Sequence, residues 1–422
     1  MTYIALTIGP IYKTLANAKN PKELFASSYI FSYIMRNIIK EFKSREFVIP
    51  YIKDDSIFDE SSKVGLFHDR FIFKSQEQES DIYKLKRVIE NISKDTASKL
   101  GLNHKDVEEY LQINYLAKEI GDENPIEALS PYLDTKELFY QLSSSDSFIS
   151  SLSRKKGDRD NFLTANKNII DDLKKLSYHK YYCVVHADGD KMGEAIKDKA
   201  NIENISKSLF GYCMESNHLI REFGGQTIFA GGDDLMFIAP TISRDRTKTI
   251  FDLCEDISQS FNIDKATLSF GISINYIKYP LYEAVENSRE LLFDKAKNEQ
   301  RNNIAFNITK HSGQSFSTVI HKGDDEIYSK FLAFTSSVND KDNIGNFLDS
   351  IHHKIATYET TLSNIKNDKT KLTNFFVNYF NKDEHKNNKE FFDHLVDFIY
   401  VATIEQVYTT LRFIKFIQGD KS

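Results

Sequence analysis

The segment Gln226-Thr-Ile-Phe-Ala-Gly-Gly-Asp-Asp-Leu-Met-Phe-Ile-Ala239 places two apolar runs on either side of a Gly-Gly pair. Glycine tolerates the positive φ angles of a tight turn, so residues 226–230 and 235–239 are predicted to pair as antiparallel strands. Asp233 and Asp234 then lie where the second strand leaves the turn. A stable hairpin does not need two adjacent carboxylates, and their charges repel unless a cation lies between them. The pair is therefore either an acidic, solvated turn or part of a metal site.

A second acidic motif, Asp188-Gly-Asp-Lys-Met-Gly193, follows the apolar run Tyr181–Ala187. The run is rich in aromatic residues and valine, which favours a central strand. Residues of helical character come after the motif, so the backbone N–H groups of residues 189–193 are expected to cradle phosphate groups. If this strand lies beside the hairpin, Asp188 meets the two aspartates of the turn.

The elements expected between residues 180 and 312 follow the order of a palm domain. After the first strand we expect a helix over 205–223, the hairpin, a helix over 247–261, a strand over 267–277, a helix over 281–298 and a short strand over 304–308. The glycine inside Leu268-Ser-Phe-Gly-Ile-Ser-Ile-Asn275 suggests that another backbone approaches closely. The order predicts a sheet with antiparallel strands and helices on one face. After residue 313 the strand signals fade, and residues 332–418 are expected to be helical.

The first part of the chain predicts half of a ferredoxin-like unit. The pattern gives a strand over 3–8, a helix over 21–42, and strands over 47–52 and 70–74. On that helix, Ala26-Ser27-Ser28 is a patch of small residues that allows another backbone or a ligand to come close. Residues 81–175 are charged and mostly helical by their periodicity.

Composition narrows the class of protein. The chain has 422 residues, which predicts two or three domains, and a net charge of −6, which argues against a generally basic nucleic-acid-binding surface. Cys183, Cys213 and Cys254 form no CxxC pair, so neither a zinc knuckle nor a disulfide framework is expected. No apolar segment is long enough to span a membrane, and the N-terminus has no charged region typical of a signal peptide. A cytoplasmic protein without membrane contact is expected.

The two acidic motifs predict a site for a metal and a nucleotide. Carboxylates are hard oxygen ligands suited to Mg²⁺ or Mn²⁺, and Mg²⁺ usually shares its coordination with phosphate oxygens. Lys297 ends a predicted helix and either contacts a triphosphate or only complements the helix dipole. Adjacent strand residues point to opposite faces, so Asp233 and Asp234 are not both expected to face Asp188. His186, two residues before Asp188, is expected to be a hydrogen-bonded core residue.

These motifs together resemble the large polymerase/cyclase-like subunit of type III CRISPR effector complexes, in the Cmr branch. In the second half the resemblance rests on His186-Ala-Asp-Gly-Asp-Lys-Met-Gly193, Phe229-Ala-Gly-Gly-Asp-Asp-Leu-Met236, Ser269-Phe-Gly-Ile272, and Ala296-Lys297 with Arg301-Asn302. In the first half it rests on Ile8-Gly-Pro10, Leu24-Phe-Ala-Ser-Ser-Tyr-Ile-Phe-Ser-Tyr33 and Gly65-Leu-Phe-His-Asp-Arg-Phe71.

The resemblance implies an α+β fold with two ferredoxin-like palm domains of the nucleotide-cyclase (GGDEF-like) kind, a helical insert and a C-terminal helical bundle. The first palm would occupy residues 1–80 and a helical region completing or linking it residues 81–179. The second, catalytic palm with its GGDD motif would occupy residues 180–312, and a helical domain residues 313–422.

The resemblance also implies an activity. Relatives convert ATP into cyclic oligoadenylate when their complex holds a matching target RNA, so other effector subunits, crRNA and target RNA are the implied partners. Asp188, Asp233 and Asp234 would be catalytic and hold Mg²⁺ or Mn²⁺, and the first palm would present the acceptor hydroxyl. The residues that match the family's nucleotide-binding positions are Gly189, Asp190, Lys191, Gly193, Gly231, Gly232, Ser269 and Lys297.

The chain departs from the family pattern in three ways. It starts directly in the first palm, so the short form without the HD nuclease domain is expected, and His68-Asp69 alone does not restore that domain. The zinc-binding cysteines are missing, so no zinc is expected. The middle helical region is reduced.

Three alternatives remain open from the sequence. ATP could be joined to a different acceptor, such as S-adenosylmethionine. The palm could be an inactive scaffold, although acidic residues stand at both motif positions. A diguanylate-cyclase-like enzyme is the third, and Asp-Asp after Gly-Gly argues against it because those enzymes carry Glu-Phe after the first acidic residue.

Overall fold

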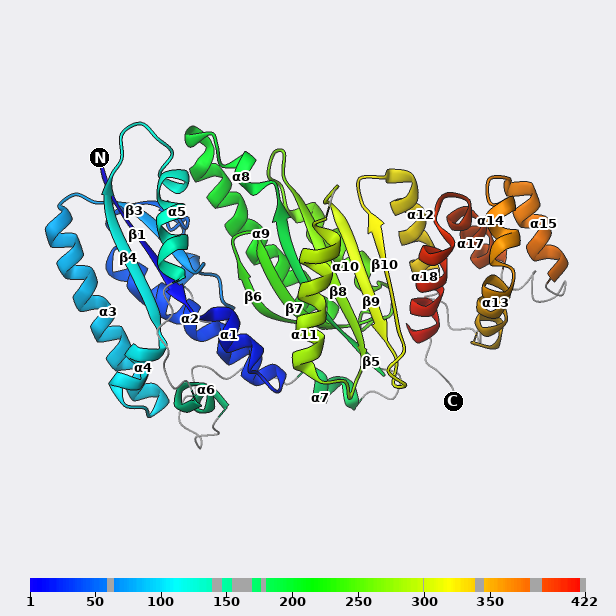
Figure 1. Cartoon of the computed structure of the whole chain (residues 1–422), viewed down its shortest axis with the longest axis horizontal. Coiled ribbons are helices and arrows are strands. Elements are labelled where there is room, and N and C mark those ends of the chain that lie inside the picture. The colour runs from blue at the N-terminus through cyan, green and yellow to red at the C-terminus, as the bar shows by residue number, and fades with distance from the viewer. Residues whose placement is uncertain are drawn as a thin grey trace.

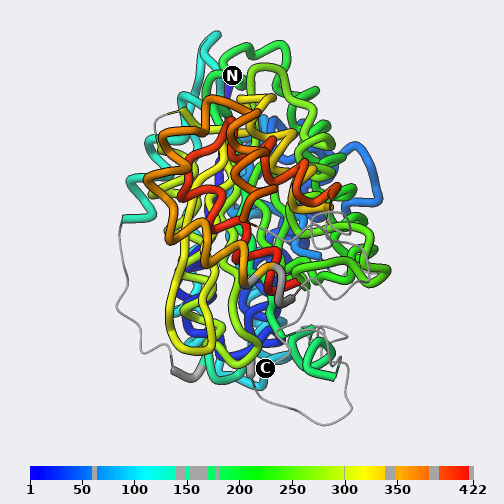
Figure 2. The backbone as a smooth tube through the Cα atoms, turned by 90° about the vertical axis from the view of Figure 1, so that its right-hand side faces the viewer, coloured from blue at the N-terminus to red at the C-terminus, as the bar shows by residue number. Residues whose placement is uncertain are grey.

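The computed structural model describes residues 1–58, 64–138, 146–153, 169–175, 180–298, 300–337, 345–379 and 389–417. Its elements form three bodies in a row: a first sheet with its helices, a second sheet with its helices, and a helical end (Figure 1). Seen from that end, the C-terminal helices lie in front of the second sheet (Figure 2). The predicted α+β class with two palm-like sheets is confirmed.

The first sheet is antiparallel and has the strand order β2-β3-β1-β4. Its strands are β1 (Thr2–Gly9), β2 (Glu46–Ile49), β3 (Arg70–Lys74) and β4 (Gln112–Glu119). Helix α2 (Pro21–Glu41) connects β1 to β2, and α3 (Gln78–Leu100) connects β3 to β4. Asn20 caps α2 by accepting from the Lys22 and Glu23 N–H groups. The first palm is therefore a complete ferredoxin-like unit.

Strand β4 corrects the prediction that residues 81–175 are mostly helical. Ile113, Tyr115 and Ala117 pack toward the core beneath α2 and α3, whereas Leu116 packs on the opposite face near α5 (Pro125–Glu137). Charged and polar residues dilute this alternation, so it is weak in the sequence. Pairing with β1 along the whole strand, rather than local preference, makes these residues a strand. The remaining short helices of this half are α1 (Ile11–Ala16), η1 (Asp55–Phe58), α4 (His104–Tyr110), α6 (Asp146–Ser153) and α7 (Ile169–Lys174).

The second sheet has six strands in the order β10-β9-β8-β5-β7-β6. Strands β5 (Tyr181–Asp190), β6 (Gln226–Gly231), β7 (Asp234–Pro240) and β8 (Thr267–Tyr276) repeat the order of the first sheet. Their connecting helices are α9 (Ile202–Phe223) and α10 (Ile250–Ser260), and a short α8 (Met192–Ala195) and η2 (Lys199–Asn201) follow β5. The predicted central strand and the hairpin at the Gly-Gly pair are confirmed.

Two further strands extend this sheet. Strand β9 (Asn303–Thr309) runs parallel to β8, and β10 (Ser315–His321) pairs antiparallel with β9. The prediction that strand structure fades after residue 313 is thus wrong for β10. The polar residues of β10 make its strand pattern weak in the sequence. A hairpin turn pairs β10 with β9, and Gly313 in that turn has a φ of +80°.

Helices cover both faces of the second sheet, which corrects the prediction of one covered face. Cys183 and Val185 on β5 join the cluster formed with α9 and α10. Tyr182 and Val184 point the other way and join the cluster that includes α11 (Leu281–Glu290). A strand buried on both faces is apolar at every position, which explains why the run beginning at Tyr181 shows no alternation.

Gly271 on β8 has the close backbone neighbour that the sequence predicted. The π-helical turn η3 (Leu291–Ala296) follows α11, and a methyl group on Gly271 would lie 2.2 Å from the Ser288 carbonyl oxygen and 2.4 Å from the Leu292 nitrogen. These are backbone atoms, so they cannot give way as a side chain would. Only glycine lets this helix lie against the sheet.

Replacing Gly271 with alanine is therefore expected to lower the free energy of unfolding by about 2–3 kcal/mol. Chemical denaturation followed by circular dichroism measures this loss. Gly211→Ala is the matched control: apart from its own helix, no atom lies within 4 Å of the added methyl, and a helical glycine gains about 0.5–1 kcal/mol on this change. Equal effects at the two positions would contradict the close approach.

The C-terminal helices pack onto the second palm. Phe251 of α10 contacts the rings of Phe306, Phe331 and Phe413 at centroid distances of 4.9, 4.8 and 4.7 Å, so the sheet and the helical end share one core. The helices are α12 (Asp325–Ser336), α13 (Gly345–Thr357), α14 (Glu359–Ile365), α15 (Lys369–Tyr379), α17 (Lys389–Val401) and α18 (Ile404–Ile417). Within the described ranges, none of the helices has the length and apolar character to cross a membrane.

Candidate functional site

The two acidic motifs meet at one end of the second sheet. Strands β5 and β7 pair as far as Ala187 and Leu235, which brings Asp188 beside the turn of the hairpin. Gly231 and Asp234 form the last pair of that hairpin. The arrangement expected from the sequence, with Asp188 next to the Gly-Gly turn, is present.

Asp188 and Lys297 form an ion pair, and both side chains are largely buried, with 17% and 15% of their surfaces exposed. The Lys297 ammonium also donates to the Gly189 carbonyl oxygen at 2.8 Å. Burial, followed by the nearby Arg301 charge, lowers the pKa of Lys297 to about 8, so the ammonium is still mostly protonated at neutral pH. Lys297, which the sequence predicts to contact phosphate, is thus paired with the Asp188 carboxylate in this structure.

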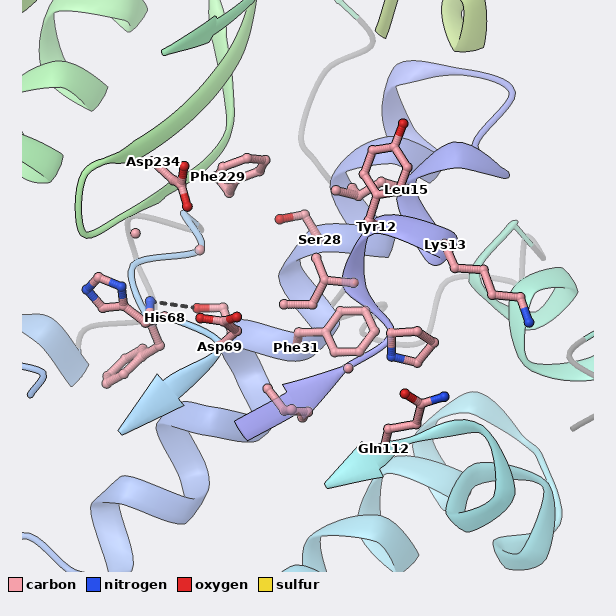
Figure 3. Close-up of a pocket in the computed structure, with 18 of the residues that line it drawn as sticks. Tyr12, Lys13, Leu15, Ser28, Phe31, His68, Asp69, Gln112, Phe229 and Asp234 are labelled. Carbon is pink, nitrogen blue, oxygen red and sulfur yellow. Dashed lines mark hydrogen bonds between the residues drawn. The ribbon is translucent and has the colours of Figure 1, made fainter. Parts of the chain in front are cut away.

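Asp233 and Asp234 point to different sides, as strand alternation predicts. A methyl group on Gly189 would lie 2.8 Å from the Asp233 carboxylate, so Asp233 lies over Gly189, next to Asp188. Asp234 faces a pocket of the first palm (Figure 3). Burial, then the Asp234 charge, raises the pKa of Asp233 to about 6; burial, then the Asp69 charge, raises that of Asp234 to about 7. Negative charge at this turn is therefore costly without a cation.

Asp190 lies deeper than the sequence suggested. It is fully buried, and its Oδ2 accepts from Thr267 Oγ1 at 2.9 Å, Ser269 Oγ at 2.7 Å and the Asn302 N–H at 2.9 Å. Ser269, which the sequence predicts to bind nucleotide, is fully buried and donates to this carboxylate. Both residues support the site from beneath.

Lys191 and Gly193 lie outside this cluster. Lys191 is exposed and adopts the left-handed conformation, with a φ of +58°, and Gly193 is exposed with open space around it. The helix that follows, α8, has only four residues. The loop predicted to cradle phosphate is therefore an open, exposed rim, and its binding of phosphate stays a prediction.

The first palm touches the Gly-Gly turn directly, which the sequence did not predict. Gly232 has a φ of +69°, and a methyl group on it would lie 1.8 Å from the His68 ring. The Ala230 N–H donates to the Gly65 carbonyl oxygen at 3.0 Å, so this edge of the second sheet is held by the segment before β3. The signal in the sequence is the polar run His68-Asp69-Arg70 between apolar residues.

A cavity of about 490 Å³ lies between this segment and the hairpin. Ser28 and Phe31 of α2, Asp69 and Gln112 line it from the first palm, and Asp234 lines it from the second (Figure 3). Ser28 belongs to the small-residue patch expected to allow close approach. The cavity therefore lies between the Asp234 side of the acidic turn and the first palm.

The donor set fits a hard divalent cation. Asp188, Asp233 and Asp234 supply only carboxylate oxygens, and a lysine ammonium already occupies the Asp188 carboxylate. Within the described ranges, no three His, Cys, Asp or Glu side chains are gathered closely enough to hold a metal ion by themselves. His186 is not part of this set: its Nδ1 lies 2.7 Å from Ser288 Oγ, and burial lowers its pKa to about 3. The expected core role of His186 is confirmed.

Comparison with known proteins agrees with both halves of the fold. The family described as Cas10/Cmr2, second palm domain, matches residues 181–305, and the family described as CRISPR-associated protein Cmr2, N-terminal, matches residues 3–101. A Cmr subunit Cmr2 of Pyrococcus furiosus is 27% identical over 174 residues, which are 33% of this chain. The match spans only 20% of that relative's length.

Solved structures share the fold at low sequence identity. A Csm1–Csm4 cassette in complex with AMPPNP matches with a TM-score of 0.59 and 13% identity, over 99% of this chain and 69% of the other. A type III-B Cmr-beta structure in the apo state matches with a TM-score of 0.60 and 10% identity, over 92% and 77% of the two chains. With both palms and both family models in agreement, the chain belongs to the Cas10/Cmr2 family of CRISPR-associated proteins.

Proposed function

We propose that this chain is a nucleotidyltransferase that joins the adenylate of ATP to a hydroxyl held by the first palm. The observation that carries the proposal is the position of the acidic turn. Asp233 lies with Asp188 and Lys297 on the second palm, while the adjacent Asp234 faces the cavity of the first palm. The donor ATP on the second palm and the acceptor hydroxyl in the first-palm cavity would meet at this turn.

The residues have separate roles in this proposal. Asp188, Asp233 and Asp234 would hold Mg²⁺ or Mn²⁺, and Lys297 would contact the triphosphate. When bound, such an ion lowers the pKa of an attacking hydroxyl and neutralises a leaving pyrophosphate. Asp190 and the backbone of Gly231 and Gly232 would keep the carboxylates in place, and the exposed Lys191 would meet the outer phosphates.

The product proposed first is cyclic oligoadenylate. Similar folds have been solved with cA4 and with pppApA bound to Csm1–Csm4 cassettes, and a Cmr-beta structure holds cognate target RNA. By analogy, this chain would work with other type III effector subunits, crRNA and target RNA. Its net charge of −6 fits RNA contacts made largely through partners.

A second acceptor is favoured by the charge of the cavity. Asp69 and Glu137 line it from the first palm and Asp234 from the second. Burial raises the pKa of Asp69, whereas the charge of Arg70, which pairs with Glu137, opposes that rise. The lining still holds three carboxylates and one lysine, Lys13. Such a region repels a triphosphate and attracts a cation, so a positively charged acceptor such as S-adenosylmethionine is the second candidate.

Product analysis tests the proposal and separates the two acceptors. The assembled effector complex, with crRNA, target RNA, Mg²⁺ and ATP, is expected to form a phosphodiester-linked adenylate product that mass spectrometry identifies. The reaction is run with and without S-adenosylmethionine. Oligoadenylate in both reactions supports ATP as the acceptor, and an adduct that requires S-adenosylmethionine supports the second candidate. If neither product forms with target RNA present, the proposed activity is refuted.

A further inference from the structure

The buried carboxylate of Asp190 is only half satisfied. Its Oδ2 accepts three hydrogen bonds, from Thr267, Ser269 and Asn302, whereas its Oδ1 is buried without a hydrogen-bond partner in the described part of the chain. Leaving a buried charged oxygen unpaired is costly, and native proteins rarely do so without a reason. The Oδ1 atom is therefore poised to accept a group that is not bound to it in this state.

The Lys297 ammonium is the candidate partner for Asp190 Oδ1. The ammonium lies 3.9 Å from Asp190 Oδ1 while it is bound to Asp188 and to the Gly189 carbonyl oxygen. A charged hydrogen bond needs about 2.8 Å, so a shift of roughly 1 Å would transfer the ammonium from one aspartate to the other. Lys322, another buried cation, donates to Ser258 Oγ at 2.8 Å and is already engaged.

We propose that Lys297 is a resident cation on Asp188 and that Asp190 receives it when a divalent cation takes Asp188. The inference rests on the proposed metal–nucleotide site and deepens it. A divalent cation on Asp188 repels the ammonium bound to the same carboxylate, which weakens the Asp188–Lys297 ion pair. Asp190 Oδ1 offers the ammonium a nearby counter-charge, so displacement exchanges one ion pair for another. Asp190 is thus a positioning residue that acts through Lys297.

After this shift, Lys297 can still donate to the phosphates of the nucleotide. The Lys297 N–H stays bound to the Leu292 carbonyl oxygen at 2.8 Å, so only the side chain has to swing. An ammonium has three donors, and Asp190 Oδ1 uses one of them. The other donors remain available to the phosphates of the donor nucleotide.

A double-mutant cycle with Mn²⁺ as the probe tests the exchange. The full chain is titrated with Mn²⁺ alone, and free Mn²⁺ is measured by electron paramagnetic resonance. Lys297→Met removes the competing cation and is expected to tighten Mn²⁺ binding about tenfold. Asp190→Asn keeps an acceptor for the three donors but removes the counter-charge, so it is expected to weaken binding about tenfold. In the Lys297→Met background, Asp190→Asn should change binding less than about twofold.

Each other result overturns the inference. Equal weakening by Asp190→Asn in both backgrounds would make Asp190 a direct metal ligand. Unchanged or weaker Mn²⁺ binding by Lys297→Met would show that lysine does not compete for the site. Asp81→Asn is the matched control, since Asp81 is also buried and accepts from Arg45, Ser75 and the Gln76 N–H, but lies in the first palm. It should leave Mn²⁺ binding unchanged.

The same titration separates this inference from the proposed function. If the wild-type chain binds no Mn²⁺, the exchange is overturned, and formation of adenylate product by the assembled complex would still support the proposed function. If binding follows the expected cycle but the assembled complex forms no adenylate product, the exchange stands and the proposed function fails. If product forms and the cycle is additive, only the exchange is wrong.

Discussion

Changing Asp233 and Asp234 together to alanine is expected to reduce product formation by at least about a thousandfold, because the loss of several kcal/mol of charge stabilisation at the reacting phosphate corresponds to that factor. Asp188 would remain, but a single carboxylate in contact with Lys297 is a weak ligand set for a divalent cation. Product is measured by mass spectrometry and by release of pyrophosphate in the assembled complex with target RNA.

The same double variant should not lose stability. Burial and the Asp234 charge raise the pKa of Asp233, and burial and the Asp69 charge raise that of Asp234, so ionising these carboxylates costs folding free energy in the absence of a cation. Removing them is therefore expected to leave the melting temperature of the metal-free chain unchanged or to raise it. A fall in melting temperature that accompanies the loss of product would indicate unfolding rather than loss of chemistry.

An adjacent pair of aspartates elsewhere provides the control. Asp171 and Asp172 on α7 are partly exposed and form ion pairs with Lys174 and Lys175 within the same short segment. Changing both to alanine removes the same charge from the chain without touching the turn. Product formation at the wild-type rate by the Asp233→Ala/Asp234→Ala variant, or an equal loss in the α7 variant, would contradict the assignment of the turn.

The central part of this site could be predicted because local sequence determines it. Gly231-Gly232 requires a hairpin, the apolar run before Asp188 requires a buried strand, and these two features place the acidic motifs together. Gly271 likewise signalled a close backbone neighbour. Each of these inferences depends on a few consecutive residues whose conformational limits are strong.

The parts that could not be predicted depend on contacts between distant segments. Strand β4 is held by β1, about a hundred residues away in sequence, and its own alternation is weak. The His68 ring packs against Gly232 and so connects the two palms, and neither local sequence indicates that these two residues come into contact. Ser269 shows the same limit: its place on β8 was clear, but only the folded sheet shows that it holds Asp190.

The second large expected effect is on product yield, when Asp69 in the cavity between the palms is replaced. Asp69→Asn is expected to lower the yield with a cationic acceptor by about 10- to 100-fold, since a hydrogen bond to a charged group contributes about 1.5–3 kcal/mol. The yield with ATP as the acceptor should change much less, because the variant also removes repulsion between Asp69 and a triphosphate. The two acceptors are compared with 3′-deoxy-ATP as the donor, which lacks the hydroxyl needed to act as an acceptor itself.

Asp134→Asn separates the role of the cavity from that of the charge network beneath it. Asp134 pairs with Arg70 at 2.7 Å, as Glu137 does at 2.6 Å, but Asp134 is not among the residues that line the cavity. Its variant should leave both acceptors unaffected. If Asp69→Asn lowers the yield equally with S-adenosylmethionine and with ATP, Asp69 orients a hydroxyl and does not select charge. If it changes neither, the acceptor does not bind in this cavity, and the donor side at Asp188 and Asp233 must be matched with a different surface of the first palm.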